Sequence, residues 1–279
     1  MPHFGINIGA LSVKVARLDD GQVAYRVVSH QGRPIQALQE ALQEFGTRGF
    51  YGVCGHLGHL SEVAATEAAL ESVDGTFDAV ASLGGETIAI YLLDSRRIIT
   101  ALSHNQCAAG GGEFFVQQIR RLGLGLEEAI RRSFDGKVVP LASRCSVHCK
   151  SDITHKLNRH EASVEDILHT LHDIMADKVV SLLEKARQPV RELLVVGGLA
   201  QNRALIAALS GKLPHTRIRV RPESLYFEAL GAALLTRAHP LYDHPHLTGN
   251  STLGVLPPLA SRTRQASVTL LPPADRSGR

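Results

Sequence analysis

Residues 4–17 read FGINIGALSVKVAR, and this stretch decides how the chain begins to fold. Apolar residues alternate with small or polar ones on both sides of Gly9, which predicts a strand, a tight turn and a second strand. Residues 22–29 predict a third strand and residues 34–45 a helix. Glycine has no Cβ, so the turn at Gly9 lets backbone amides approach a phosphate closely.

The same order begins again at residue 77, where residues 77–93 read FDAVASLGGETIAIYLL. This stretch predicts a buried strand, a turn at Gly84-Gly85-Glu86 and a second strand, followed by a strand at 98–103 and a helix at 113–122. A third glycine pair, Gly197-Gly198, follows an apolar strand. The repetition predicts two similar α/β lobes with a nucleotide between them.

The longest predicted helix covers residues 163–187, with apolar side chains in a 3.6-residue rhythm and a capping box from Ser163 to Asp166. Other predicted elements are strands at 50–54 and 193–196 and helices at 62–73, 202–213 and 228–237. We expect an N-terminal lobe at 1–76, a C-terminal lobe at 77–238, and a proline-rich tail at 239–279 that is extended or partly disordered.

The overall composition narrows the class of protein. The chain has 279 residues and a net charge of +3, with Lys and Arg spread along it, which argues against nucleic acid as a partner. No apolar stretch is long enough to span a membrane, and the N-terminus lacks the features of a signal peptide. We therefore expect a cytoplasmic protein, in which four cysteines favour metal or redox chemistry over disulfides.

Two of these cysteines have distinctive surroundings. Cys107 precedes the glycine-rich turn Gly110-Gly111-Gly112, which could present backbone amides to a phosphate or to a cluster sulfide, and Cys145 lies in RCSVH. Two thiolates are half of the four that an iron–sulfur cluster usually requires. A chain that offers only two would need a second copy to complete the site.

Taken together, these segments resemble the BadF/BadG/BcrA/BcrD-type ATPases, the activase family of 2-hydroxyacyl-CoA dehydratases and benzoyl-CoA reductases. Residues 5–14 resemble the first phosphate loop of the family, D-x-G-S-T-S-x-K, and residues 82–87 resemble the second, D-I-G-G-Q-D. The other matching segments are CAAGGG at 107–112, RCSV at 144–147, VGGLAQN at 196–202, PE at 222–223 and ALGAAL at 229–234. The run KSDI at 150–153 is closest to the first module of the two-module activases.

The resemblance implies an actin-like ATPase fold of two lobes around a nucleotide cleft, and a homodimer or heterodimer with a related subunit. It implies that Cys107 and Cys145 bind a [4Fe–4S] cluster shared across the dimer. ATP turnover would then drive a low-potential electron from a ferredoxin or flavodoxin donor into a partner acyl-CoA dehydratase or reductase. The implied nucleotide-binding residues are Gly9, Ala10, Ser12, Lys14, Gly84, Gly85, Glu86, Gly110, Gly111, Gly112, Gly197, Gly198 and Asn202.

The departures from the family pattern fall on the chemistry of ATP and Mg²⁺. Asn7, Ser82 and Thr87 occupy positions where the family has carboxylates that hold Mg²⁺ and orient the attacking water. Glu86 is the carboxylate that remains in these loops, and we assign the catalytic roles to Glu86 and Lys14. Nucleotide binding is expected to survive these changes while hydrolysis is slow or absent.

Four alternatives follow from the same residues. Cys145, His148 and Cys149 could bind zinc, and Cys54 and Cys149 could complete a cluster within one chain. A sugar or acyl kinase of the same fold needs a base carboxylate that Asn7 and Ser82 do not provide. A degenerate partner subunit would bind nucleotide without turnover.

Overall fold

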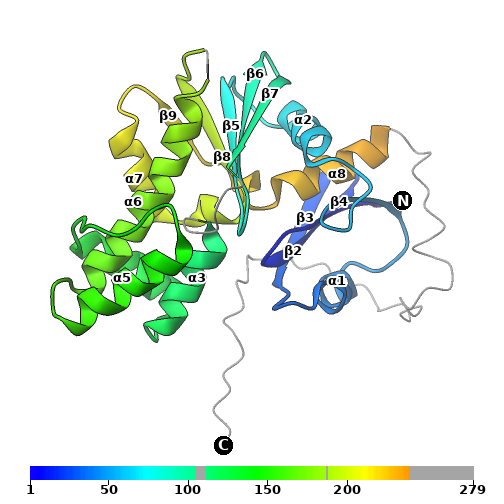
Figure 1. Cartoon of the computed structure of the whole chain (residues 1–279). Helices are drawn as coiled ribbons and strands as arrows, with labels where there is room; N and C mark the ends of the chain where they lie inside the picture. The colour runs from blue at the N-terminus through cyan, green and yellow to red at the C-terminus, as the bar shows by residue number, and fades with distance from the viewer. Residues whose placement is uncertain (105–110, 187, 239–279) are drawn as a thin grey trace, which may run out of the picture. The chain divides into compact units, whose positions relative to one another are not determined.

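The computed structural model describes residues 1–104, 111–186 and 188–238. The chain divides into two compact units (Figure 1). The first consists of Met1–Val73 together with the C-terminal stretch that begins at Tyr226, and the second is Asp74–Leu225. None of the helices in the described ranges is long and apolar enough to cross a membrane.

The first unit is built on a four-stranded sheet with the order β3-β2-β1-β4. Strand β1 (His3–Ile8) pairs antiparallel with β2 (Ser12–Asp19) and parallel with β4 (Phe50–Gly55), while β3 (Gln22–Ser29) pairs with β2. Three helices pack around this sheet: α1 (Pro34–Gln43), α2 (Glu62–Ser72) and α8 (Phe227–Ala238).

The alternation along β1 sorts its residues onto two differently covered faces. Phe4, Ile6 and Ile8 are buried in a core that includes α1. Gly5 lies against α8, because a Cβ at this residue would come within 1.7 Å of the Ala229 carbonyl oxygen. The helix α8 therefore lies directly on the β1 backbone, and Asn7, two residues beyond Gly5, belongs to this second face.

The second unit repeats the strand order of the first. Its five-stranded sheet has the order β7-β6-β5-β8-β9, in which the first four strands correspond to β3-β2-β1-β4. The strands are β5 (Ala79–Leu83), β6 (Ile88–Asp94), β7 (Arg97–His104), β8 (Glu192–Val196) and β9 (Arg217–Arg219). The predicted duplication of a strand–turn–strand–strand unit is thus confirmed.

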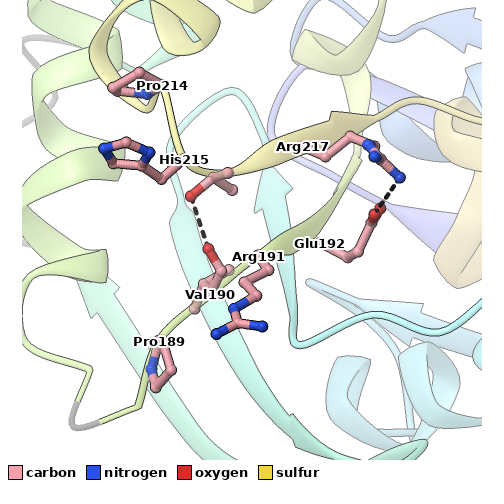
Figure 2. Close-up of a pocket in the computed structure, with 8 residues that line it drawn as sticks. Pro189, Val190, Arg191, Glu192, Pro214, His215 and Arg217 are labelled. Carbon is pink, nitrogen blue, oxygen red and sulfur yellow. Dashed lines mark hydrogen bonds and ion pairs between the residues drawn. The ribbon is translucent and has the colours of Figure 1, made fainter.

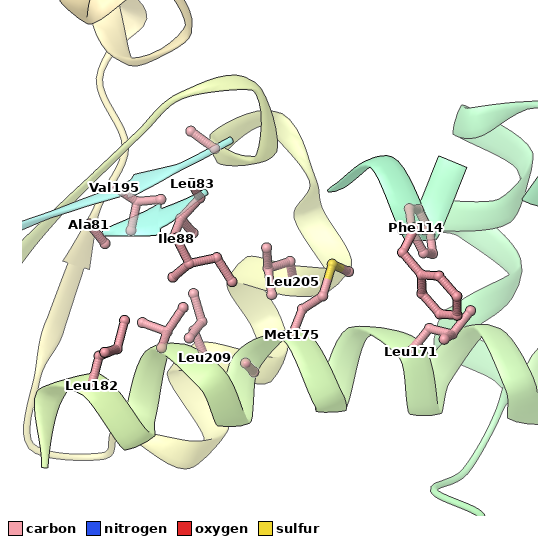
Figure 3. Packing of buried hydrophobic residues seen from close by; sticks show 14 of the residues in the cluster. Ala81, Leu83, Ile88, Phe114, Leu171, Met175, Leu182, Val195, Leu205 and Leu209 are labelled. Carbon is pink, nitrogen blue, oxygen red and sulfur yellow. The ribbon is translucent and has the colours of Figure 1, made fainter. Parts of the chain in front are cut away.

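Helices α6 (Val164–Leu183) and α7 (Arg203–Lys212) lie side by side along one face of this sheet (Figure 1). Figure 3 shows Met175 and Leu182 of α6 and Leu205 and Leu209 of α7 packed against the strand residues of the buried core. The predicted capping box at the start of α6 is confirmed, since the Ser163 hydroxyl accepts from the Asp166 amide and the Asp166 carboxylate accepts from the Ser163 amide. The helix ends at Leu183, before the predicted end at residue 187.

Helix α3 (Gly112–Arg121) agrees with the prediction, but three elements have no predicted counterpart: α4 (Leu126–Arg132), α5 (Ser146–Asn158) and β9. Short 3-10 helices cover Ser133–Asp135, Gly198–Gln201 and Pro222–Tyr226. The structure also differs from the predicted division of the chain, because α8 belongs to the first unit rather than to the second. The predicted tail at 239–279 lies outside the described residues.

Candidate functional site

The two glycine turns have the same hydrogen bonding in the two units. The first glycine of each turn, Gly9 or Gly84, donates its amide to the carbonyl three residues later, at 3.1 and 2.9 Å. The next residue is Ala10 or Gly85, and within the described part of the chain its amide donates no hydrogen bond. Each turn therefore has an N–H group available for an anionic ligand such as a phosphate.

A second glycine lies beside each turn, at the end of the neighbouring parallel strand. Gly55 and Gly197 have φ values of +86° and +90°, which favour glycine. A Cβ on Gly55 would lie 2.3 Å from the Ile8 carbonyl oxygen, and one on Gly197 would lie 2.5 Å from that of Leu83. Both turns thus lie at the carboxyl ends of parallel strands, where α/β sheets bind their ligands.

A row of polar side chains crosses the first sheet beside its turn. Asn7 on β1 is in register with Lys14 on β2 and with Cys54 on β4, so the three side chains point to the same face. The Lys14 Nζ donates to the Asn7 Oδ1 at 3.3 Å, and the Asn7 Nδ2 contacts the Cys54 Sγ at 3.5 Å. All three residues are buried, with Lys14 only 7% exposed. Burial raises the pKa of the Cys54 thiol to about 12, so this cysteine is a neutral thiol at physiological pH.

Two carboxylates that were not among the predicted site residues belong to the same region. The Asn7 Nδ2 also donates to the Glu62 Oε1 at 3.3 Å, and Glu228 lies near enough to affect both Glu62 and Cys54. Burial, followed by the charge of Glu228, raises the pKa of Glu62, while the Asn7 hydrogen bond and Lys14 oppose this rise. In the sequence, Glu62 follows Ser61 at the start of a predicted helix. This pattern could have placed Glu62 in the first turn of that helix, but not beside Asn7.

The second turn is bound to the start of α3. The amides of Gly112 and Glu113 donate to the carbonyls of Gly84 and Gly85 at 3.3 and 2.8 Å. Gly111 and Gly112 are buried, and a Cβ on Gly112 would lie 3.2 Å from the Gly84 carbonyl oxygen. The amide of Gly112 is therefore already used within the protein. Gly110, a predicted phosphate contact, lies outside the described residues.

The remaining polar residues of the second turn are Ser82, Glu86 and Thr87. Glu86 and Thr87 are exposed, and Ser82 is partly buried on β5. Ser82 occupies the position on β5 that Asn7 occupies on β1. Its register partners on the neighbouring strands are the apolar residues Ala89 and Val196, whereas those of Asn7 are Lys14 and Cys54. The predicted catalytic residues Lys14 and Glu86 thus belong to different units.

Asn202, predicted to bind nucleotide, uses its side chain within the protein. Its Oδ1 accepts from the amides of Ala204 and Leu205 at 3.1 Å, which caps the N-terminus of α7, and its Nδ2 donates to the His172 Nε2 at 3.0 Å. Asn202 is 4% exposed. The structure therefore gives this side chain the role of fixing the Gly197-Gly198 loop to α7.

Of the two predicted cluster ligands, Cys145 is described and Cys107 lies outside the described residues. Cys145 is a partly exposed free thiol that immediately precedes α5. Cys149, one turn later, is 1% exposed and belongs to the hydrophobic core, so it does not share the environment that zinc binding with Cys145 and His148 requires. Among the described residues, no three His, Cys, Asp or Glu side chains come together as metal ligands.

The sequence comparisons identify the family. A model of the BadF/BadG/BcrA/BcrD ATPase family matches residues 5–236. This chain belongs to that family. The match includes both glycine turns, the Lys14–Asn7–Cys54 row, Glu62, Cys145 and Glu228.

This member of the BadF/BadG/BcrA/BcrD family is 27% identical over 253 residues to the activator of lactoyl-CoA dehydratase of Anaerotignum propionicum, covering 84% of this chain and 96% of that protein. It is 29% identical over 157 residues to the 2-hydroxyisocaproyl-CoA dehydratase activator of Clostridioides difficile; this match covers 56% of this chain and 58% of the relative's length. A solved activator of the 2-hydroxyisocaproyl-CoA dehydratase from Clostridium difficile, with bound ADPNP, superimposes with a TM-score of 0.77 at 23% identity, covering 90% of this chain and 100% of that one. The predicted actin-like ATPase fold is confirmed.

This family member has a surface hollow in the second unit (Figure 2). It is lined by Pro189, Val190, Arg191, Glu192, Pro214, His215, Thr216 and Arg217. These residues lie at the start of β8 and at the start of β9, whereas Gly197 follows the other end of β8. Two contacts join residues that line the hollow: the Thr216 hydroxyl donates to the Val190 carbonyl at 2.7 Å, and Arg217 forms an ion pair with Glu192 at 2.8 Å. The hollow is therefore at the opposite end of β8 from the Gly197-Gly198 loop.

Proposed function

We propose that this chain binds ATP and ADP with Mg²⁺ and is an ATP-dependent activator of a CoA-ester dehydratase or reductase, to which it passes a low-potential electron from a [4Fe–4S] cluster. Membership of the BadF/BadG/BcrA/BcrD ATPase family supports this proposal, as do the names of the activators that the chain resembles. A ferredoxin or flavodoxin would serve as the electron donor.

The buried ammonium group of Lys14 is the observation that carries the nucleotide part of the proposal. Its hydrogen-bond partner is the neutral amide oxygen of Asn7 at 3.3 Å, and the Glu62 carboxylate lies at the other end of that amide. A buried ammonium group is costly unless its charge and its hydrogen bonds are satisfied, so an anion bound beside Lys14 would be stabilised. The Nζ lies 3.4 Å from where a Cβ of Gly9 would be, which places it beside the turn that has a free amide. The oxygens of a phosphate can accept hydrogen bonds from both the Lys14 ammonium group and the free amide of the turn.

Replacing Lys14 with methionine is expected to weaken binding of ADP and of a non-hydrolysable ATP analogue by roughly 10- to 100-fold, the usual value of a hydrogen bond to a charged group. Titration calorimetry would measure the affinity, and the nucleotide-induced rise in melting temperature would check it. The control is Lys212→Met, which breaks ion pairs with Asp173 and Asp177 in the second unit. Equal nucleotide affinity in wild type and Lys14→Met would contradict the assignment.

The cluster part of the proposal rests on the chemistry of the available thiols. Cys145 is a partly exposed free cysteine at the N-cap position of the 13-residue helix α5. Cys54 and Cys149 are buried, so they are unsuitable as ligands for a shared cluster. Cys107 and Cys145 would hold the cluster, two from each subunit of a homodimer or heterodimer. When bound, the cluster supplies one-electron chemistry at low potential.

The variant Cys145→Ser is expected to lose nearly all cluster iron after anaerobic purification, because serine removes one of the two thiolates per chain. Iron content and the visible absorbance of the cluster are the readouts, and the dimer should dissociate in size-exclusion chromatography. Cys149→Ala, on the same helix but in the core, should keep its iron. Full iron in Cys145→Ser would remove this cysteine from the proposed site.

A second candidate function, a nucleotide-binding partner subunit without turnover, is favoured by one observation. Ser82 and Thr87 bring no carboxylate to the second turn, where Glu86 is the acidic residue. Phosphate release from ATP by the purified dimer separates the two candidates. A protein that binds nucleotide with Mg²⁺ and holds the cluster, but releases no phosphate above background, would be such a partner subunit.

A further inference from the structure

Asn7 connects a cation to a carboxylate through the two ends of one amide group. Its Oδ1 accepts from the Lys14 ammonium and its Nδ2 donates to the Glu62 carboxylate, both at 3.3 Å. A neutral amide satisfies both neighbours, because one end is an acceptor and the other a donor. A carboxylate at position 7 would place negative charge against Glu62 at this distance. Asparagine at 7 and glutamate at 62 are therefore a matched pair.

The loop before α2 fixes the position of Glu62. After β4 the chain turns back on itself, with the Leu60 amide donating to the Val53 carbonyl at 2.9 Å. Gly58 packs on the β4 backbone, because its Cβ would lie 2.4 Å from the Cys54 Cα. The Ser61 hydroxyl then accepts from the Ala64 amide and starts α2, so that Glu62 is the first helical residue. Its carboxylate is thereby held at the carboxyl ends of β1 and β4, beside the first glycine turn.

Glu62 is suited to a role outside the protein's own packing. The residue is exposed on one side and reaches Asn7 on the other, whereas Glu228 is 5% exposed. Glu228 adds negative charge to the same region, as its effects on Glu62 and Cys54 show. Mg²⁺ bound with a nucleotide usually takes one or two carboxylates, together with phosphate oxygens and water. The exposed carboxylate of Glu62 fits the role of one such metal-facing group.

We propose that Glu62 is the carboxylate that faces the Mg²⁺ of the bound nucleotide at the first glycine turn, and that Asn7 is the residue that positions it. This inference rests on the proposed nucleotide-binding function. It gives the first unit a metal-facing carboxylate that comes from the start of α2 rather than from β1.

The first test compares nucleotide affinity with and without Mg²⁺. In Glu62→Gln, the gain in affinity for a non-hydrolysable ATP analogue on adding Mg²⁺ should fall by about 10-fold or more, the usual effect of losing a residue that supports a metal. The affinity without Mg²⁺ should be retained, which also shows that the variant is folded. Glu71→Gln, an exposed residue on the same helix, is the control and should keep the full Mg²⁺ gain. An unchanged Mg²⁺ gain in Glu62→Gln would overturn the inference.

The second test exchanges the members of the pair. The double variant Asn7→Asp with Glu62→Gln restores one carboxylate and one amide with their positions reversed, so its Mg²⁺ gain should recover to within about threefold of wild type. A double variant no better than Glu62→Gln alone would contradict the pairing. If the wild-type protein binds the analogue neither with nor without Mg²⁺, the proposed function fails and this inference with it. If wild type shows a Mg²⁺ gain that both Glu62 variants keep, only this inference fails.

Discussion

Replacing Gly231 with alanine is expected to destabilise the first unit by more than about 3 kcal/mol, at or beyond the upper end of the usual cost of overpacking. The added Cβ would lie 1.7 Å from the Ala65 carbonyl oxygen, so the α8 and α2 backbones would have to move apart. These helices pack directly on each other, and α8 also covers the face of the sheet that carries Asn7. Chemical denaturation monitored by circular dichroism would measure the loss.

The matched control is Gly211→Ala in α7. No atom lies within 4 Å of a Cβ at Gly211, so alanine there should stabilise the helix by roughly 0.5–1 kcal/mol. The same substitution in two helices is thus expected to have opposite signs. Equal unfolding midpoints for the two variants would show that α8 and α2 are not in such close contact.

Acid is expected to destabilise the second unit through His172. Burial lowers the pKa of His172 to about 4, from an ordinary value of 6.5. Burial keeps the ring neutral; its Nδ1–H donates to the Leu168 carbonyl at 2.8 Å, and its Nε2 accepts from the Asn202 amide at 3.0 Å. Asn202 cannot reverse its amide, because its oxygen caps α7. A proton on the His172 Nε2 would therefore point at the Asn202 Nδ2, which is itself a hydrogen-bond donor, and the hydrogen bond between them would be lost.

The direction of the effect follows from the lowered pKa. Between pH 6.5 and pH 4, the unfolded chain binds a proton at this histidine and the folded protein does not, so stability falls as the pH falls through this range. Each pH unit removes about 1.4 kcal/mol, which gives on the order of 3 kcal/mol in total. The pKa of Glu62 is raised instead, so protonation of this carboxylate stabilises the folded protein as the pH falls through the lower part of the range.

Denaturant titrations from pH 7 to pH 4.5 would measure this loss. His172→Gln should be less stable at pH 7 but should lose most of the pH dependence, because glutamine does not titrate. His155→Gln, at an exposed position on α5, should keep the wild-type dependence. A His172→Gln profile that runs parallel to wild type would contradict the assignment.

The sequence was sufficient to predict the parts of the fold that depend on local pattern. Alternating apolar residues around Gly9 and Gly84 predicted the paired strands and their turns, and the Ser163 capping box predicted the start of α6. Helix α5 was missed because its sequence is mostly polar, with Cys149 and Ile153 as its buried residues. Their four-residue spacing was the available signal.

The candidate site was harder to predict because its residues meet through tertiary structure. Glu62 is 55 positions from Asn7, and the parallel pairing of β1 with β4 brings the two together. The motif at 196–202 predicted that Asn202 binds nucleotide. In the folded protein its side chain instead caps α7 and donates to His172. A motif specifies residue types, whereas the hydrogen-bond partners depend on the folded neighbours.

The assignment of α8 to the first unit affects the order in which the chain can fold. The second unit, Asp74–Leu225, is inserted between two parts of the first. During synthesis the complete second unit leaves the ribosome before α8, which ends at Ala238. Until then, the sheet face that carries Asn7 and Lys14 has no cover from α8. The second unit can thus fold from one continuous segment, whereas the first must close a loop of the whole second unit before it is complete.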